Sequence, residues 1–184
     1  MPNDASNVKW SGVGGGVGGS DLALQNSLIY GGKLGYYFDQ VKLGRFNPGI
    51  ETEVFNATPH LKQQGATIGG TTSRLSGFTH SVVTWAPVVL LVRYQAGAFE
   101  PYAGVGVGLF FSNLRTGDNG DATMHVGLNT QVGIRYRVTQ SLSLFTEWKY
   151  NHAHIEHSNI GGSPLSLSFD YNVHIVAGGV GYHF

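Results

Sequence analysis

The sequence has no cysteine, little charge and no long apolar run. Without cysteine there can be no disulfide bond, no thiolate-bound zinc and no thiol nucleophile. Charged residues make up only 12% of the 184 residues, about half the share found in typical soluble proteins. Acidic and basic residues are equal in number, so the net charge does not indicate nucleic-acid binding. So little charge is unusual for a surface that is in contact with water everywhere.

The apolar runs are too short for a membrane-spanning helix. The longest lies near Val82–Val92 and is interrupted by Thr84 and Pro87, whereas a spanning helix needs about 20 apolar residues. In hydrocarbon, only helices and closed β-barrels satisfy every backbone N–H and C=O group. If the chain enters a membrane, it must therefore do so as a barrel.

The length suits one domain, and we expect a single domain over residues 1–184 with a flexible segment at residues 1–6. The first residues, Met1–Asp4, lack the basic region and the apolar region of an export signal. We therefore expect the sequence to correspond to the mature form of an exported protein.

What the sequence does contain is alternation with a period of two. Between Met124 and Val138, apolar residues recur on one face, and polar residues and glycine occupy the other. The segment from Leu142 to Asn151 repeats the pattern, with aromatic residues near its end. This alternation indicates strands, and aromatic residues near the ends of apolar faces are typical of transmembrane barrels. We predict an all-β fold, a single closed antiparallel transmembrane β-barrel of eight strands, near residues 7–17, 27–38, 45–60, 79–94, 98–112, 124–138, 142–151 and 168–184.

The connections between these strands alternate in length. Short turns at the periplasmic end and long loops outside the cell are the usual arrangement in such barrels. The strand near residues 79–94 is apolar on both faces and contains Pro87, which is awkward in a central strand, so its faces remain unassigned. The predicted turns are Asp39–Gly44, Gln95–Gly97 and Thr139–Ser141, and the predicted loops are Gly18–Asn26, Leu61–Thr79, Asn113–Thr123 and Asn159–Leu167.

Three segments resemble the opacity-type, OmpA-like family of small outer-membrane barrels. Phe145–His152 is similar to the penultimate strand of that family, Val176–Phe184 to its last strand and Phe99–Gly108 to its fifth. The resemblance spans essentially the whole chain. It implies a place in the outer membrane of a Gram-negative bacterium, in contact with lipid and lipopolysaccharide. It also implies that Tyr182 and Phe184 form the signal recognised by the barrel-insertion machinery.

The polar face of the predicted strands carries acids and bases in near-equal numbers. An eight-stranded barrel is barely wide enough for its own side chains, and buried charges must be paired. We therefore predict a lumen plugged by an internal charge network, with inward glycines in residues 98–112 leaving room for Arg and Lys. The alternative is a narrow, porin-like channel. The predicted network consists of Glu51, Glu53, Arg93, Arg135, Glu147 and Lys149, with Lys33 as a further candidate.

His152, His154 and Glu156 are spaced by two and share one face of a strand. Imidazole nitrogens with a nearby carboxylate can bind zinc, copper or nickel, so a metal-binding extracellular rim is a second alternative. A metal site needs three or four convergent ligands. The other interpretation is that these polar residues lie where the strand emerges from the lipid.

The nearest enzymatic interpretation is a lipid A deacylase, which needs a serine and a histidine on one face. His157 and Ser158 are adjacent and so point to opposite faces, while His154 and Ser158 are roughly 13 Å apart along a strand. We therefore expect neither an enzyme nor a cofactor.

The predicted role is structural, in the cell envelope, with adhesion-like contacts between the loops Leu61–Thr79 and Asn113–Thr123 and a surface ligand. A soluble lipid-binding barrel, with its apolar face turned inward, is the competitor outside the membrane.

Overall fold

The computed structural model describes residues 4–12, 15–18, 22–23, 29–57, 64–68, 71–75, 79–116, 119–157 and 166–184. It is built almost entirely of antiparallel strands, and the one helical element, η1 (Asp39–Val41), is a single turn. No helix in these ranges is long and apolar enough to cross a membrane. The strands are β1 (Asp4–Gly12), β2 (Gly15–Gly18), β3 (Leu22–Ala23), β4 (Ile29–Tyr37), β5 (Phe46–Ala57), β6 (Gln64–Ile68), β7 (Thr71–Leu75), β8 (Thr79–Tyr94), β9 (Phe99–Thr116), β10 (Asn119–Arg137), β11 (Leu142–His157) and β12 (Ser166–Tyr182).

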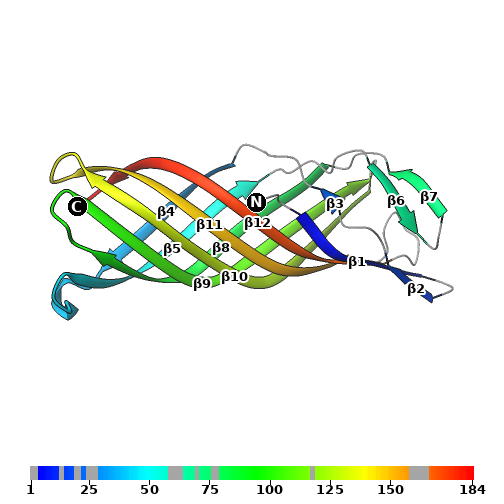
Figure 1. Ribbon diagram of the computed structural model, residues 1–184, viewed down its shortest axis with the longest axis horizontal. Helices are drawn as coiled ribbons and strands as arrows, with labels where there is room; N and C mark the ends of the chain where they lie inside the picture. The colour runs from blue at the N-terminus through cyan, green and yellow to red at the C-terminus, as the bar shows by residue number, and fades with distance from the viewer. Residues whose placement is uncertain are drawn as a thin grey trace.

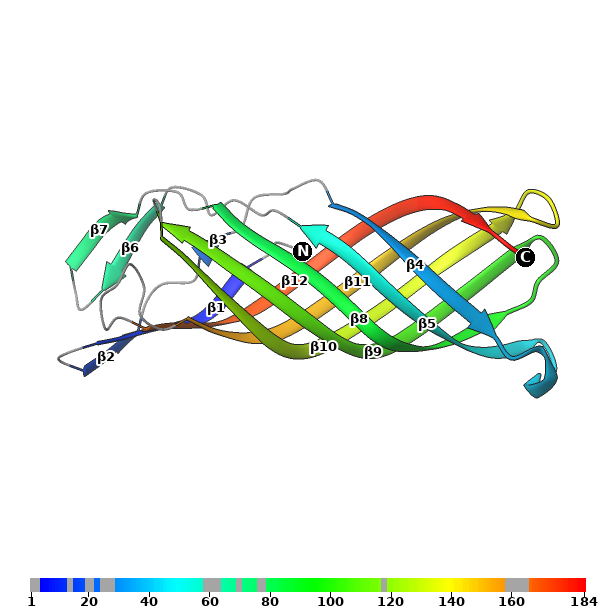
Figure 2. The ribbon, with the colours of Figure 1, turned by 180° about the vertical axis from the view of Figure 1, so that it is seen from behind.

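One strongly curled sheet contains all the long strands (Figures 1 and 2). Its order is β2-β1-β12-β11-β10-β9-β8-β5-β4, with β3 added beside β1, and every pairing is antiparallel. β6 and β7 form a separate hairpin. Strands β1, β4, β5 and β8–β12 correspond to the eight that the alternation predicts, so the prediction of eight antiparallel strands is confirmed.

The short connections all lie at the end of the sheet where the chain terminates, at the left of Figure 1. They are η1 with the residues around it, the turn between β8 and β9 and the turn between β10 and β11. Gly44 and Gly97 have φ angles of +65° and +70° in two of these turns, a conformation that glycine adopts without a steric cost. This end is the periplasmic one by the usual orientation of such sheets.

At the opposite end, the strands run further than the sequence suggests. β9 and β10 remain paired up to Thr116 and Asn119, so the prediction of a loop over Asn113–Thr123 is wrong for most of that segment. β11 continues to His157 instead of ending at residue 151. Polar residues are compatible with a strand here because, in β11, they alternate with buried residues such as Ala153 and Ile155. The predicted loop Leu61–Thr79 contains the β6–β7 hairpin.

The first predicted strand is divided in two. β1 begins at Asp4, where it pairs with Asn172 of β12, and β2 folds back on β1 to form a hairpin. Residues 4–6, expected in a flexible segment, are therefore part of the sheet. A glycine-rich sequence lets the chain reverse between Gly12 and Gly15 where the alternation alone suggests one continuous strand.

A β-bulge explains why β8 is apolar on both faces. The register shifts between Trp85 and Val88 on β8, opposite the shift on β5 between Glu51 and Glu53. One extra residue exchanges the two faces of a strand. The buried residues accordingly have even numbers before the bulge and odd numbers after it: Val82, Thr84 and Ala86, then Val89, Leu91 and Arg93.

Pro87 occupies this bulge, where the ladder is interrupted and its missing N–H removes no regular hydrogen bond. Thr52 compensates from the neighbouring strand. Its hydroxyl donates to the Ala86 carbonyl at 3.2 Å and accepts from the Trp85 indole N–H at 3.2 Å. The side chains of Thr52 and Trp85 therefore supply hydrogen bonds on the outward side of the bulge, where the regular backbone pattern is interrupted.

The two edges of the sheet, β4 and the periplasmic part of β12, face each other without pairing in the described ranges. The sheet curls around an interior but is not closed at this seam. The described residues thus confirm the predicted strands but do not confirm the predicted closure.

Candidate functional site

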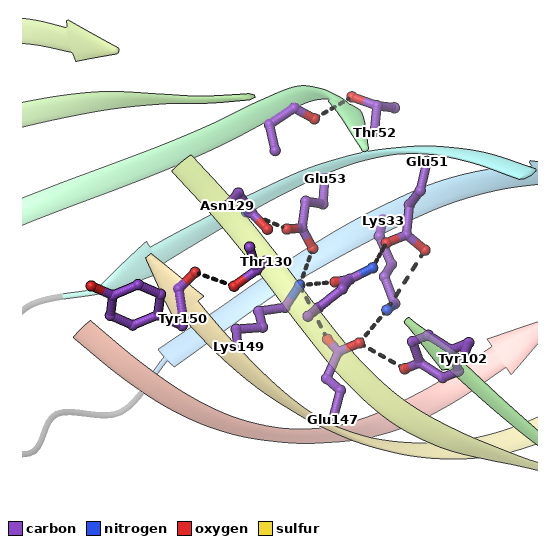
Figure 3. A network of polar contacts seen from close by, with 12 residues as sticks. Lys33, Glu51, Thr52, Glu53, Tyr102, Asn129, Thr130, Glu147, Lys149 and Tyr150 are labelled. Carbon is purple, nitrogen blue, oxygen red and sulfur yellow. Dashed lines mark hydrogen bonds and ion pairs between the residues drawn. The ribbon is translucent and has the colours of Figure 1, made fainter. Parts of the chain in front are cut away.

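Side chains from β4, β5 and β8–β12 fill the interior of the sheet, and several charged ones lie close together in the view of Figure 3. The centre of this group is the Lys149 ammonium, which contacts the Glu53 carboxylate and the Gln131 side-chain oxygen and lies 3.5 Å from Glu147. Asn129 donates to the other Glu53 oxygen at 2.7 Å. All five side chains are buried. A buried ammonium is tolerated here because carboxylates and an amide surround it.

Lys33 extends this cluster toward β4. Its ammonium lies 2.5 Å from Glu147 and 3.6 Å from Glu51. The Tyr102 hydroxyl donates to the same Glu147 oxygen at 2.7 Å, and Gln131 donates to Glu51 at 2.9 Å. Two lysines and three glutamates are thus joined in one network across the lumen. We refer to Lys33, Glu51, Glu53, Glu147 and Lys149 as the central network.

A second cluster lies nearer the periplasmic end, around the buried Glu100. Its carboxylate accepts from Arg93 at 3.2 Å and from Arg137 at 2.5 Å, and the Arg135 guanidinium is 3.9 Å away. The Arg93 guanidinium also stacks over the Tyr37 ring, 3.9 Å from its centroid. Three guanidinium groups therefore share one buried carboxylate, and Arg93 is further stabilised by the Tyr37 ring and by the Asp39 carboxylate, 3.6 Å away.

All six residues predicted for the charge network are buried inside the sheet, and Lys33 is partly buried beside them. They form two clusters and not one: Arg93 and Arg135 belong with Glu100, the other four with Lys33. Sequence reasoning missed Glu100 and Tyr102. Both lie on the inward parity of β9, the same parity as its glycines, and that parity could have identified them.

Toward the extracellular end, the interior is apolar. Nine buried residues from five strands form one hydrophobic cluster there, and the Phe110 and Tyr171 rings meet edge to face with centroids 6.0 Å apart. The predicted charge network therefore does not extend into this half of the interior. We call the cluster the apolar plug; it consists of Phe55, Val82, Phe110, Ala153, Ile155, Phe169, Tyr171, Val173 and Ile175.

Inward glycines make room for rings and branched chains. A Cβ on Gly133 would lie 2.6 Å from the Tyr102 ring, and one on Gly104 would lie 2.5 Å from Leu91. Contrary to the prediction, the space beside the β9 glycines therefore accommodates mainly Leu91, Val89 and Phe110 and not arginine or lysine. A larger residue at these positions would displace the aromatic and aliphatic filling of the lumen.

The outward side of the extracellular rim carries polar side chains on β11 and β12. The His154 Nδ1 lies 2.7 Å from an Asp170 oxygen, and Asn7 of β1 donates to the other oxygen at 2.6 Å. The hydrogen bond to Asp170 raises the pKa of His154 above its ordinary range, and the same bond lowers the pKa of Asp170. A charged pair is therefore favoured on this surface near neutral pH.

The three residues of the metal hypothesis do not converge. His154 Nε2 lies 3.3 Å from Glu156, but His152 is directed to Asn172, with Nδ1 2.9 Å from its oxygen. In the described ranges, no group of three or more His, Cys, Asp or Glu side chains is arranged to hold a metal ion. The rim is therefore an array of hydrogen-bonded pairs.

His157 points inward, opposite to His154, as the spacing predicts. It is buried, and its Nε2 lies 3.0 Å from the Ser112 hydroxyl on β9. The His125 ring packs edge to face against it at 6.4 Å between centroids. Ser158, the serine of the deacylase alternative, lies outside the described residues.

The two aromatic residues assigned to the insertion signal lie at the periplasmic end, and both are exposed. Tyr182 is the last residue of β12 on the outward parity, and Phe184 follows it. Their recognition by insertion machinery remains a prediction.

Comparison with known proteins identifies the family. The family model described as outer membrane protein beta-barrel domain matches residues 1–184. An uncharacterized outer-membrane protein, y4mB, of Sinorhizobium fredii is 28% identical over 185 residues, which cover 92% of this chain and 71% of the relative. The family predicted from the strand motifs and the predicted location are both confirmed.

Two solved structures are similar in fold. The outer membrane protease OmpT of Escherichia coli superposes with a TM-score of 0.52 at 12% identity, over 92% of this chain and 67% of the protease. Neisserial surface protein A gives a TM-score of 0.43 at 13% identity, over 98% of this chain and 94% of that protein. At such identities the first likeness concerns the fold alone.

Proposed function

Because this chain belongs to the family of outer membrane protein β-barrel domains, we propose that it is a structural, non-enzymatic protein of the bacterial outer membrane that closes into a filled barrel and presents its extracellular hairpins to other surfaces. The observation that carries the proposal is the filling of the interior on two levels. The central network lies below, and the apolar plug lies above it.

A conducting pore needs a continuous wet path, and the apolar plug opposes one. Phe110, Val82 and Ile155 are fully buried and come from three different strands. Hydrophobic constrictions exclude water and ions. The acidic and basic side chains below the plug then neutralise one another inside a narrow lumen and do not form an ion path.

The extracellular hairpins support a role in surface contact. β9 and β10 stay paired to their tips, and the β6–β7 hairpin lies at the same end of the sheet (Figure 1). Paired strands hold a surface in a fixed geometry, which lowers the entropic cost of binding a partner. We propose that residues 61–79 and the tip of the β9–β10 hairpin make adhesion-like contacts.

The first experiment is conductance in planar lipid bilayers. The unchanged chain is expected to give no stable channels. A variant with Phe110→Ala and Ile155→Ala thins the plug and should give measurable openings if the plug is the barrier. Conductance of the unchanged chain that is lost on changing Glu147 or Arg135 would favour the channel alternative instead.

The second experiment tests surface contact. Bacteria that display the chain should aggregate or adhere to mucin-coated surfaces more than bacteria that display a variant with residues 61–78 replaced by a short Gly-Ser linker. Equal folded amounts of both are verified from gel migration with and without boiling. Unchanged adhesion after shortening both this segment and the β9–β10 tip would contradict the proposed role.

A further inference from the structure

Cationic side chains are concentrated at the periplasmic end of the sheet. The turns and strand ends that form this end span residues 38–46, 93–100, 135–142 and 182–184. They contain five basic residues, Lys42, Arg45, Arg93, Arg135 and Arg137, against two acids, Asp39 and Glu100. The chain as a whole has equal numbers of acidic and basic residues, so this excess of positive charge is local.

The two acids at this end are already paired. Glu100 is buried and faces three guanidinium groups, and Asp39 lies 3.2 Å from the Lys42 ammonium. Arg45 is exposed, and among the residues that the structure describes no carboxylate forms an ion pair with it. Its guanidinium donates to the Tyr94 hydroxyl at 3.4 Å. The periplasmic end therefore carries positive charge that its own acids do not neutralise.

The turn between β4 and β5 also exposes large apolar side chains beside these cations. Val41 is 58% and Leu43 76% exposed, on either side of Lys42 in the sequence. This turn lies to one side of the periplasmic end, apart from the other two turns (Figures 1 and 2). Exposed apolar residues next to basic ones are typical of segments that lie in a membrane interface.

Aromatic pairs on the outward face mark the level of the lipid headgroups at this end. The rings of Phe46 and Tyr94 pack with centroids 5.1 Å apart, and those of Phe99 and Tyr136 with centroids 4.9 Å apart. Aromatic residues with a polar tip favour the interface between hydrocarbon and water. Because Arg45 contacts the Tyr94 hydroxyl, its charge lies at the same level.

We propose that Lys42, Arg45 and the Tyr94 hydroxyl bind the phosphate of an anionic glycerophospholipid in the periplasmic leaflet. Val41 and Leu43 insert among the acyl chains and hold the turn at the surface. Ammonium and guanidinium groups bind phosphate through charge-assisted hydrogen bonds, and the positive excess complements the negative headgroup. The inference goes beyond the proposed function, since it needs the outer-membrane location but neither a filled lumen nor adhesion.

A fluorophore beside the site measures which lipid occupies it. The chain has no cysteine, so Gln40→Cys in η1 can be labelled alone. In vesicles, phosphatidylglycerol that carries a nitroxide on its acyl chain should quench the fluorophore more than phosphatidylcholine with the same nitroxide. In 1 M salt this preference should vanish, because the Debye length is then about 3 Å. Equal quenching by the two lipids at low salt overturns the proposal.

Charge variants assign the preference to the proposed residues. Lys42→Gln combined with Arg45→Gln should lower the relative affinity for phosphatidylglycerol about fivefold for each charge removed. Lys9→Gln is the matched control, because it removes an exposed charge at the extracellular end, and it should leave the preference unchanged. Folding of both variants is verified from gel migration with and without boiling. A full preference in the double variant overturns the proposal.

The depth of the turn is tested with a nitroxide at Leu43→Cys. Oxygen, which is enriched in hydrocarbon, should reach this label better than a water-soluble nickel chelate does. The same label at Gln140→Cys, in the turn between β10 and β11, should show the reverse. If the chelate reaches both positions equally, the β4–β5 turn lies in water and the proposal is wrong.

Two further measurements distinguish other ligands. Inorganic phosphate at constant ionic strength should not displace the labelled phosphatidylglycerol, and displacement would mean a site for small anions. Purified peptidoglycan should sediment as much of the double variant as of the unchanged chain, and a loss confined to the variant would assign the charges to the cell wall. Either result overturns the proposal. The conductance and adhesion experiments use other variants, so failure of the proposed function would be seen separately.

Discussion

In the periplasmic half of β11 and β12, the outward side chains are apolar, such as Leu144, Trp148 and Val180, and the inward ones include Glu147 and Lys149. In the extracellular half of the same strands, the order is reversed. His154, Glu156 and Asp170 lie outside, while Ala153, Ile155 and Phe169 are buried inside. The lower half follows the rule for a sheet in lipid, and the upper half follows the rule for a sheet in water. The change takes place near Asn151 and Val173 without any break in hydrogen bonding between the strands.

This reversal shows that the solvent around each level, not the strand itself, decides which face is apolar. It also locates the outer boundary of the membrane at the level where Trp148 and Tyr150 contact His174, since aromatic residues favour that interface. Four experiments test the comparison, beginning with the largest expected effect.

The largest loss is expected on removing the central cation of the lower half. Lys149→Met leaves Glu53 and Glu147 less compensated in a buried site. The free energy of unfolding should fall by about 3–5 kcal/mol, measured by urea unfolding in lipid vesicles. The double variant Lys149→Met, Glu53→Gln is the control and should recover part of the loss. A single variant as stable as the unchanged chain would mean that the network does not stabilise the fold.

In the upper half, the largest loss should come from an apolar side chain. Ile155→Ala opens a cavity in the apolar plug, because Ile155 is fully buried. We expect a loss of about 2–5 kcal/mol in the same assay. Glu156→Ala, one residue further on the outward face, should change stability by less than about 1 kcal/mol. Equal effects of the two changes would show that the upper half has no apolar interior.

The lipid boundary is tested by one substitution at two levels. Val132→Arg places a charge on the outward face of the lower half and should cost about 2–4 kcal/mol if it lies near the bilayer midplane. His154→Arg places the same charge on the outward face of the upper half, beside Asp170, and should cost almost nothing. If both variants are equally destabilised, the two levels do not differ in solvent.

The smallest effect is a pH dependence confined to the upper half. The raised pKa of His154 stabilises the fold fully below its ordinary value of 6.5, and this contribution is lost as the pH rises through the higher folded value. The lowered pKa of Asp170 stabilises the fold above its ordinary value of 3.8, and this is lost as the pH falls through the lower folded value. The contribution of this pair to stability should therefore decline slightly from pH 6 to pH 8.

Asp170→Asn is the matched control for this pH dependence. Without the carboxylate, the imidazole of His154 loses the partner that raises its pKa. Urea unfolding at pH 6 and pH 8 should then differ less than for the unchanged chain. A difference that persists in this variant would have to come from another group.

Much of the fold could be predicted from the alternation in the sequence. In the strands around Val132 and Leu144, apolar and polar residues alternate without interruption. Both the faces of these strands and their pairing could therefore be predicted. Two features were not. The bulge at Pro87 reverses the parity within β8, and nothing local shows where the extra residue lies. The extracellular extensions of the strands alternate as regularly as the membrane parts. Asn113–Thr123 was predicted to be a loop because its residues are polar, but polar residues also occur in strands.

The inward orientation of the charged residues in the candidate site could be predicted from the alternation along each strand. Glu51, Glu53, Glu147 and Lys149 were assigned inward because their neighbours are apolar, and the ion pairs follow from their sharing one level. Partner choice was not predictable, because it depends on the stagger between strands distant in sequence. Glu53 and Lys149 are separated by 96 positions. The apolar plug was not predicted, because alternation alone does not show whether apolar residues such as Ile155 and Phe169 face the lipid or the interior.

The length of the β9–β10 hairpin determines how far it extends beyond the membrane. β9 contains 18 residues, which at about 3.3 Å per residue give a length of roughly 60 Å. At a tilt of about 40°, the strand is roughly 45 Å tall, against an apolar band of about 25 Å. Nearly half of its height therefore stands clear of the hydrocarbon. A protein partner can therefore bind the tip of this hairpin without contacting the lipid, while the membrane-embedded part of the sheet holds the hairpin in place.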